Sequence, residues 1–425
     1  MSGAGDAAAG RLEALGVRVD GVERPGTVEE VSAELQRAAR EGRRVLPVGT
    51  GAHVPPRSLP ERAVLLVVDR LSGIERYEAA DLTLTAGAGT TLTELGAALT
   101  EHGQWLPFDP PDVEGRTLGG LAAGGAGSPL EAGYGAVRNH VLGATAVLGD
   151  GRVVRLGGRV VKNVAGFDLL RPLVGSGGTL AVLTSICVRV FPVPATDRVL
   201  LFGAADVDEA ARLAMALARA PVQPASATVL TGPALPEPAL PEVRREDGDG
   251  AFGLLVRLHG SEGAVEAEQA RLEGVLGAGS SRVAPASVPE TTARARDRVW
   301  TGGHGVGLVH VLPDRLAPAL DAVLELEGRG PRPALVADPF PARVRFSFGP
   351  GHVEALPGLR RSIERLGGTL GFERAPAGAP ELLAALRAAS SEPGAAERAL
   401  ARRIHAVYDP GGVLGGATAE QEAVA

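Results

Sequence analysis

The stretch VLPVGTGAHVPPR, residues 45–57, places two glycines and a histidine directly after a short apolar run. Glycines at the end of a strand let the backbone adopt positive φ and approach a ligand closely, so this loop is a candidate phosphate cradle of main-chain N–H groups. A P-loop is excluded because no lysine follows Gly51, and a dinucleotide fingerprint is excluded because Pro55 and Pro56 occupy the place of a third glycine. A plain surface turn remains the alternative for this loop taken alone.

Capping signals and apolar periodicity indicate the elements that hold this loop. Thr27 and Glu30 have capping-box spacing before a helical apolar pattern, and Thr91 and Glu94 repeat the signal. Strands are expected over 43–48, 63–69, 82–89 and 179–190, and a hairpin through Asp150-Gly151 is expected over 141–158. Because helices alternate irregularly with strands joined by short turns, the pattern favours an α+β fold over a doubly wound sheet.

Residues 191–197, FPVPATD, form a proline-broken hinge that predicts a domain boundary. Beyond it a strand followed by a helix occurs three times, which predicts an antiparallel sheet with helices on one face. A loop is expected over 231–250, and one more strand and two helices are expected from ARVRFSFG onward. The predicted division is an N-terminal extension over 1–24, a first domain over 25–195, a cap domain over 196–345 and a short, helical C-terminal segment over 346–425.

Composition narrows the class of protein. The 425 residues are enough for two or three domains, and a formal net charge of −7 argues against nucleic acid as a partner. Cys187 is the single cysteine of the sequence, so this chain alone can form neither an internal disulfide nor an iron–sulfur cluster. Residues 1–20 lack the apolar core of an export signal, and no run of about 18 apolar residues occurs. We therefore expect a cytoplasmic protein or, as the alternative, one that is attached to the inner face of the cell membrane only through partners.

Two further glycine-dense segments follow the opening loop. They are LPFDPPDVEGRTLGGLAAGGAGSPLEAGYGAVRNHVLG, residues 106–143, and GGRVVKNVAGFDLLRPLVGSGGTLAVLT, residues 157–184. Together with residues 45–57, and in this order, they resemble the FAD-binding PCMH-type domains of the vanillyl-alcohol-oxidase family. The run VVKNVAGFDL, residues 160–169, points within that family to the FAD-binding subunits of bacterial glycolate oxidases. The resemblance covers roughly residues 25–195.

The resemblance implies that residues 25–195 form two α/β subdomains that bind FAD without a covalent bond. The first loop would wrap the diphosphate, the Thr-x-Gly-Gly stretch would run beside the cofactor, and the third segment would pass near the adenine. The cofactor-binding residues that it implies are Val48, Gly49, Thr50, Gly51, Ala52, His53, Pro111, Thr117, Gly119, Gly120, Ala123, Gly124, Gly127, Gly178, Ala181 and Val182. The residue types suit this role, because backbone N–H groups can neutralise a diphosphate only where side chains do not block the approach.

The sequence departs from the family pattern at three places. Ala181 stands where the family has a glycine near the adenine, and Gly166-Phe167-Asp168 stands for the usual Gly-Tyr-Asp. The C-terminal stretch DPGGVLGG, residues 409–416, lacks the family's Asn-Pro-Gly ending. A contact between this tail and the flavin is therefore not implied.

His53 is the most conspicuous candidate for chemistry. Several relatives attach FAD covalently through a histidine that directly follows the glycine pair, but here Ala52 takes that place. We expect His53 to point toward solvent or a phosphate. Lys162 and Asp168 could tune a flavin or could form a helix cap or an ion pair, and Cys187 is expected to be a small packing residue.

The cap region offers no constellation of histidine and carboxylate for catalysis, so the catalytic residues are not assigned. His304 and His310 are six residues apart without a neighbouring carboxylate, so no metal site is expected. Arg343 and Arg345 flank an expected strand and could bind a carboxylate with two hydrogen bonds each. A solvated strand face is the preferred interpretation of this arginine pair.

The leading functional hypothesis is an FAD-binding, electron-transferring subunit of a glycolate-oxidase-like dehydrogenase complex. Its partners would be a catalytic flavoprotein and an iron–sulfur subunit, and the resemblance implies both. One alternative is a free-standing FAD-dependent dehydrogenase or oxidase of a 2-hydroxy acid or a sugar alcohol. A second alternative is a scaffold that has lost the cofactor and serves only for assembly.

Overall fold

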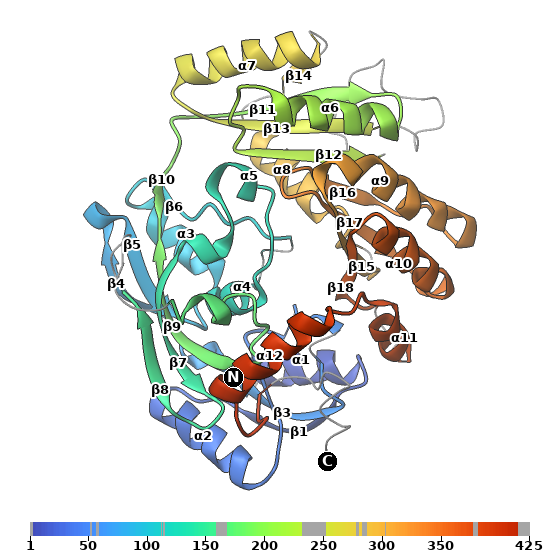
Figure 1. Ribbon diagram of the computed structural model, residues 1–425. Helices are drawn as coiled ribbons and strands as arrows, with labels where there is room; N and C mark the ends of the chain where they lie inside the picture. The colour runs from blue at the N-terminus through green and yellow to red at the C-terminus, as the bar shows by residue number, and fades with distance from the viewer. Residues whose placement is uncertain are drawn as a thin grey trace.

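The computed structural model describes residues 3–51, 53–56, 59–111, 113, 115–158, 168–231, 252–277, 280–282, 287–301, 303–376 and 381–414. They form a first domain with two main sheets and one two-stranded sheet, and a cap domain with one large sheet (Figure 1). The predicted loop over 231–250 lies outside these ranges beyond Thr231. Within the described ranges no helix is long and apolar enough to cross a membrane.

The first sheet of the described residues has three parallel strands. In order across the sheet they are β1 (Arg18–Glu23), β3 (Arg62–Val67) and β2 (Val45–Val48). Helix α1 (Gly3–Glu13) buries Ala8 and Leu12 in a core with Leu46 and Leu65. Strand β1 therefore places part of the expected N-terminal extension inside the first domain.

Both predicted capping signals begin helices, α2 (Val28–Arg40) and α3 (Leu92–Thr100). Thr27 accepts a hydrogen bond from the Glu30 N–H at 3.1 Å, while the Glu30 carboxylate accepts from the N–H of the residue before the cap. The box of α3 is complete, because the Glu94 carboxylate accepts from the cap residue's N–H at 2.8 Å. Each bond satisfies an N–H that the first helical turn leaves without a partner.

The second sheet of the first domain has five strands within the described residues. In order across the sheet they are β4 (Ile74–Glu78), β5 (Thr83–Gly87), β9 (Ala181–Arg189), β7 (Val141–Leu148) and β8 (Val153–Gly157). Strands β7 and β8 form the predicted hairpin, in which Gly151 has a φ of +83°. Helices α4 (Leu118–Gly124) and α5 (Glu131–Tyr134) lie between this sheet and the cap (Figure 1).

The first two residues of the predicted hinge form a short strand before the cap begins. Strand β10 (Phe191–Pro192) lies antiparallel to β6 (Gln104–Trp105), and the first cap strand then starts at Thr196. The described residues of the cap form an eight-stranded antiparallel sheet. In order across it the strands are β14 (Ser280–Arg282), β11 (Thr196–Ala204), β13 (Phe252–Gly260), β12 (Ser226–Thr231), β16 (Leu335–Asp338), β17 (Arg343–Phe348), β15 (Gly305–His310) and β18 (Thr369–Arg374).

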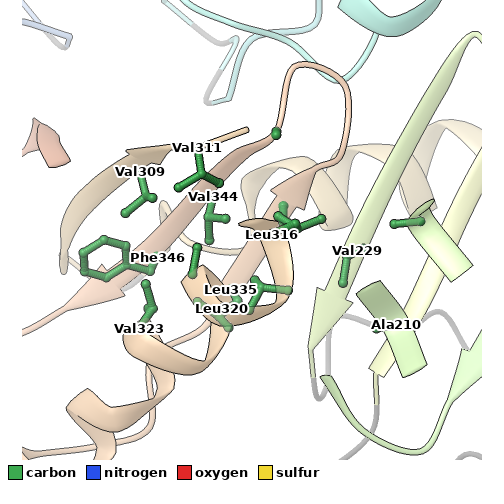
Figure 2. Close-up of a cluster of buried hydrophobic side chains, with 14 of the residues drawn as sticks. Ala210, Val229, Val309, Val311, Leu316, Leu320, Val323, Leu335, Val344 and Phe346 are labelled. Carbon is green, nitrogen blue, oxygen red and sulfur yellow. The ribbon is translucent and has the colours of Figure 1, made fainter. Parts of the chain in front are cut away.

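Helices cover both faces of the cap sheet, so the prediction of helices on one face is incomplete. The face with most of them carries α6 (Val207–Arg219), α7 (Glu262–Leu276), α9 (Leu316–Leu324) and α10 (Leu356–Arg365). Figure 2 shows Val344 and Phe346 of β17 against Leu320 and Val323 of α9 in this core. Helix α8 (Val288–Asp297) packs on the other face through Val288 and Ala295, next to Trp300.

The C-terminal region contains more elements than expected. Strand β18, helix α10 and helix α11 (Leu382–Ala389) extend the cap, whereas α12 (Ala395–Tyr408) returns to the first domain (Figure 1). There the Tyr408 hydroxyl donates to the Leu169 carbonyl at 2.9 Å, and the Val45 N–H donates to the Val413 carbonyl at 2.8 Å. The core of the first domain therefore includes residues from the end of the described chain.

Candidate functional site

An open cleft lies in the first domain where the end of β2, helix α4 and the start of β9 meet. It holds about 760 Å³ of empty space, part of it open to solvent. Its described lining combines residues from all three glycine-dense segments.

Most of the predicted cofactor-binding residues line this cleft. They are Val48, Gly49, Thr50, Gly51, His53, Thr117, Gly119, Gly120, Ala123, Gly124, Gly178, Ala181 and Val182. Ala52 lies outside the described residues. Pro111 and Gly127 are described but lie outside the lining.

Sequence reasoning missed several lining residues: Pro47, Val54, Pro55, Val68, Arg116, Gly177 and Leu183. All except Val68, which follows β3, are next to a predicted residue or within two positions of one. Adjacency in sequence could have found them. Arg116 is the most consequential of them, because among the described lining residues only Arg116 and His53 have ionisable side chains.

Three of the predicted glycines pack tightly against protein. A Cβ atom on Gly49 would lie 2.4 Å from the Thr117 hydroxyl, and one on Gly119 would lie 2.8 Å from Ala88. Gly51 has a φ of +72°, and its Cβ would lie 2.9 Å from Ala8 of helix α1. These glycines therefore bring the loop, α4 and α1 together, which is a different role from leaving room for a ligand.

Other glycines face open space and give the cleft a wall of bare backbone. A Cβ atom on Gly124 would meet nothing within 4 Å. Gly178, with a φ of +78°, has its nearest neighbour, Pro47, at 3.6 Å. This wall suits a ligand that contacts main-chain groups, as the diphosphate of FAD would. The residues present therefore fit the cofactor that the resemblance implies.

Arg116 is held beside the cleft by the loop that contains Pro111. Its side chain is buried, and Nε donates to the Pro111 carbonyl at 2.9 Å. Pro111 therefore has an indirect connection to the cleft through Arg116. The guanidinium also lies 5.9 Å from the centre of the Trp300 ring, which belongs to the cap.

His53 lies at the meeting point of the first domain and the cap. Its ring lies edge-on to Trp300 with the ring centres 5.6 Å apart, and Arg374 lies 5.1 Å from the Trp300 ring on β18 of the cap. We expected the His53 side chain to point toward solvent or a phosphate, and this expectation did not include an aromatic contact. One feature of the sequence could have pointed to this contact, because Trp300 is one of only two tryptophans in the chain.

The remaining sequence candidates lie away from the cleft lining. Cys187 is buried on β9 between β5 and β7, as a packing residue would be. Asp168 pairs with Arg171, whose Nε donates to it at 2.8 Å, and Lys162 lies outside the described residues. His310 ends β15 with an exposed side chain. In the part of the chain that the structure describes, no cluster of three metal-ligating side chains occurs.

Arg343 and Arg345 are buried, so the interpretation as a solvated strand face is wrong. Only 5% and 2% of their surfaces are exposed. Arg345 donates to Glu373 at 2.8 and 3.2 Å, and both arginines lie against Asp338. Burial disfavours the charged carboxylate, but the Arg345 guanidinium holds the pKa of Glu373 below its usual value. The carboxylates that these arginines bind thus belong to the protein.

Asp109 is a half-buried carboxyl at the boundary between the two domains. Burial raises its pKa from 3.8 to about 6, although the Ser128 hydroxyl donates to it and Arg257 and Arg296 favour its charged form. An ionised Asp109 is therefore costly to the folded protein at neutral pH.

The C-terminal tail contacts the strand behind the cleft and not its described lining. Asp409 is buried and accepts hydrogen bonds from the N–H groups of Val413 and Leu414 at 2.9 and 2.8 Å. Leu414 in turn pairs with Val45, the first residue of β2. The tail thus supports the strand that leads into the cleft loop.

Part of the chain matches a known family model. Residues 19–157 match the family model described as FAD binding domain, a range that runs from β1 to the last residue of β8. The first domain is an FAD-binding domain of the PCMH type, and FAD is its cofactor. The predicted fold class is confirmed.

Curated relatives match this chain over part of its length. D-lactate dehydrogenase of Archaeoglobus fulgidus is 40% identical over 173 residues, 40% of this chain and 38% of the relative. Glycolate oxidase subunit GlcE of Escherichia coli is 46% identical over 123 residues, 29% of this chain and 35% of the relative. Glycolate oxidase subunit GlcD of Bacillus subtilis is 30% identical over 217 residues, 51% of this chain and 46% of the relative. The matches thus span less than half the length of these three relatives.

Solved structures match over most of the chain. One structure of alkyldihydroxyacetonephosphate synthase has a TM-score of 0.70 at 17% identity and covers 92% of this chain and 76% of that one. A second structure of the same enzyme gives a TM-score of 0.67 at 16% identity. At such low identity the likeness establishes the fold, including the cap, and nothing about the reaction.

Proposed function

We propose that the chain is an FAD-dependent oxidoreductase of the 2-hydroxy-acid dehydrogenase kind. More specifically, it serves as the FAD-binding, electron-transferring subunit of a glycolate-oxidase-like complex. The observation that carries the proposal is the glycine-lined cleft, formed by three segments within or next to an FAD-binding domain match. The 46% identity to a glycolate oxidase subunit supports the assignment as a subunit.

The chain's own residues divide the work of holding FAD. The bare backbone near Gly124 and Gly178 receives the diphosphate, and Arg116 supplies a cation held in place by the Pro111 carbonyl. His53 and Trp300 close the side of the cleft that faces the cap. We propose that His53 makes no covalent bond to the cofactor. Bound FAD would supply a two-electron acceptor for an alcohol carbon or for a partner flavin.

The partners would be a catalytic flavoprotein and an iron–sulfur subunit. Support comes from two relatives, from different organisms, whose names mark each as a glycolate oxidase subunit. The sequence contributes one cysteine, whereas an iron–sulfur cluster takes about four. Electrons leaving this flavin by way of a cluster would therefore pass to another chain.

A second candidate is a free-standing dehydrogenase of a 2-hydroxy acid. The 40% identity to a D-lactate dehydrogenase favours it, and so do two cations next to the Trp300 ring, Arg116 and Arg374, which could attract a carboxylate. A free-standing dehydrogenase needs a base that takes the proton from the substrate hydroxyl. General-base catalysis typically raises the reaction rate about 10²–10⁴-fold.

The experiment that separates the two candidates is steady-state turnover of glycolate and D-lactate with an artificial electron acceptor. The FAD-loaded chain is assayed alone and after mixing with a separately purified catalytic flavoprotein of a glycolate oxidase. We expect little turnover from the chain alone and a large gain on mixing. Equal turnover in both samples would contradict the subunit assignment and favour the free-standing dehydrogenase. Absence of any flavin absorbance would instead favour the cofactor-free scaffold.

A further inference from the structure

Two buried arginines of the cap hold the segment that follows the flavin-site helix α4. Arg345 Nη2 donates to the Gly127 carbonyl at 3.0 Å, and Arg343 Nη2 donates to the Ser128 carbonyl at 3.2 Å. Arg343 also lies 3.2 Å from the Glu131 carboxylate, at the start of α5. A single strand, β17, thus holds consecutive carbonyls of the first domain.

The charges around the arginine pair are balanced inside the protein. Asp338 Oδ2 lies 3.1 Å from Arg343 and 3.4 Å from Arg345. Glu373 binds Arg345 from the neighbouring part of the cap, and Glu131 binds Arg343 from the first domain. Because the guanidinium groups are fixed from both sides, they can set the position of the backbone that they contact.

Gly127 shows how closely the two domains fit here. A Cβ atom at this position would lie 1.4 Å from Arg343 Nη1 and 2.1 Å from its Cζ. No side chain fits between the carbonyl segment and the guanidinium. The glycine is therefore required by the cap and not by the cleft, whose described lining does not include it.

The held segment is connected to the cleft on both sides of α4. Gly124 lines the cleft, and Gly125 ends α4 in a left-handed conformation only two residues before Gly127. On the other side, the Ser128 hydroxyl donates to Asp109, whose loop continues to the carbonyl that fixes Arg116. The cap thus contacts the chain that leaves α4 directly, and it is linked through Ser128 to the chain that enters α4.

We propose that Arg343 and Arg345 are positioning residues of the FAD site, which fix α4 from the cap so that the cleft reaches its binding geometry only when the cap is docked. The proposal depends on FAD binding and on no particular substrate or partner. It also implies that any ligand or subunit that shifts β17 will change the affinity for FAD.

The test compares Gly127→Ala and Arg345→Lys with a matched control, Arg198→Lys. Arg198 is also a buried arginine of the cap, only 3% exposed, and it pairs with Glu262. It lies on β11, and among the hydrogen bonds and ion pairs of the described residues it makes none to the first domain. Three quantities are measured: the dissociation constant of FAD, the visible circular dichroism of bound flavin, and amide hydrogen exchange of residues 118–128 in the FAD-free protein.

We expect both test variants to raise the dissociation constant of FAD about tenfold or more and to speed exchange in residues 118–128. The control should change neither, even if its melting temperature falls by the same amount. Dissociation constants within about twofold of wild type in both folded test variants would overturn the proposal, as would an equal change in the control. If Gly127→Ala does not fold, the comparison of Arg345→Lys with Arg198→Lys decides.

Discussion

Glycines of the cleft fall into two chemical roles that a single added methyl group can separate. Gly124 is exposed to the cleft with nothing near its Cβ position, whereas Gly119 contacts Ala88. Glycine inside a helix costs roughly 0.5–1 kcal/mol relative to alanine. We expect Gly124→Ala to keep or raise the stability of the FAD-free protein while weakening FAD binding, because the methyl group enters the cleft.

Replacing two other helical glycines by alanine, Gly119 and Gly96, provides the comparisons for this prediction. Gly119→Ala should lower the stability of the FAD-free protein, because its Cβ has to displace the backbone around Ala88. Gly96→Ala in α3 has open space and lies far from the lining, so it should stabilise without altering FAD affinity. Urea unfolding and flavin titration of the three variants check this. A Gly124→Ala variant with unchanged affinity would show that FAD does not approach that wall.

Asp109 predicts a pH dependence of stability with a definite sign. Its pKa is about 6 in the folded protein against the usual 3.8, so the folded state binds the proton more tightly. Its contribution to stability is therefore lost as pH rises from about 4 to about 6. At pH 7.5, Asp109→Asn should be more stable than wild type by up to roughly 3 kcal/mol.

Chemical denaturation at two pH values tests the Asp109 prediction. The gain of Asp109→Asn should shrink toward zero near pH 3, where the wild-type carboxyl is largely protonated in both states. A gain that is equal at both pH values would mean that the substitution acts through packing, and no gain at pH 7.5 would mean that the charge is well compensated by Arg257 and Arg296.

At the scale of elements, helix α1 and the cleft loop depend on each other. Ala8 packs against Gly51, and Arg11 donates to the Thr50 carbonyl at 2.9 Å. We expect Gly51→Val to bind little FAD and to release α1, since a bulky residue at positive φ costs roughly 1–2 kcal/mol before any clash. Limited proteolysis within residues 3–16, together with flavin content, measures both effects.

A matched control isolates backbone strain from the contact with α1. Gly42 has a φ of +62° and no neighbour within 4 Å of its Cβ position, so Gly42→Val imposes the same strain without a clash. It should leave α1 protected and the protein yellow. Release of α1 in both variants would show that strain alone, and not the packing of Ala8, explains the effect.

The helices and strands that carry a short-range sequence signal, such as a helix cap or a turn, could be predicted from the sequence. The caps at Thr27 and Thr91 and the turn at Asp150-Gly151 are short-range features, so the helices and the hairpin that they mark could be found from sequence. Strands β1 and β4 were missed because their sequences, RVDGVE and IERYE, are polar and mostly partly exposed at sheet edges. Helix α4 has glycine-rich sequence and poor intrinsic propensity, so packing and not composition makes it helical.

Candidate site residues that belong to a sequence motif could be predicted. Those that come together only at the contact between the two domains could not. Adjacent glycines identified most of the cleft. The contact of Trp300 with His53 and the burial of Arg345 both arise from docking of the cap, which joins segments more than 200 residues apart in the chain. The separation of such residues along the chain does not indicate how close they lie in the folded protein.

At the scale of the whole molecule, the cleft predicts a preference among flavins. We propose that the bare backbone near Gly124 and Gly178 receives the diphosphate, and the lining continues from there to Val182 on β9. Of FAD, FMN and riboflavin, only FAD has both a diphosphate and an adenine to fill the two parts. A ligand that binds the native state stabilises it by about 2.7 kcal/mol at a hundredfold excess over its dissociation constant. We expect FAD to raise the melting temperature of the FAD-free protein clearly more than FMN or riboflavin at equal concentration.

Analysis of the released flavin provides the independent check of this preference. Heat treatment should release FAD from the purified protein, and acid precipitation should leave the pellet colourless, in line with a non-covalent site. Equal thermal shifts for FAD and FMN would place the cofactor in only part of the cleft. Flavin that stays with the precipitated protein would require a covalent link and a new interpretation of His53.

The return of the chain end to the first domain sets the order in which the protein can mature during its synthesis. Tyr408, Val413 and Leu414 belong to the core of the domain that contains the cleft, and Leu414 pairs with the first residue of β2. A ribosome has therefore translated the entire cap before the strand leading to the cleft loop gains its final neighbour. The finished first domain therefore forms only after residue 414 has been synthesised, and a nascent chain stalled after the first 200 residues lacks this support of β2.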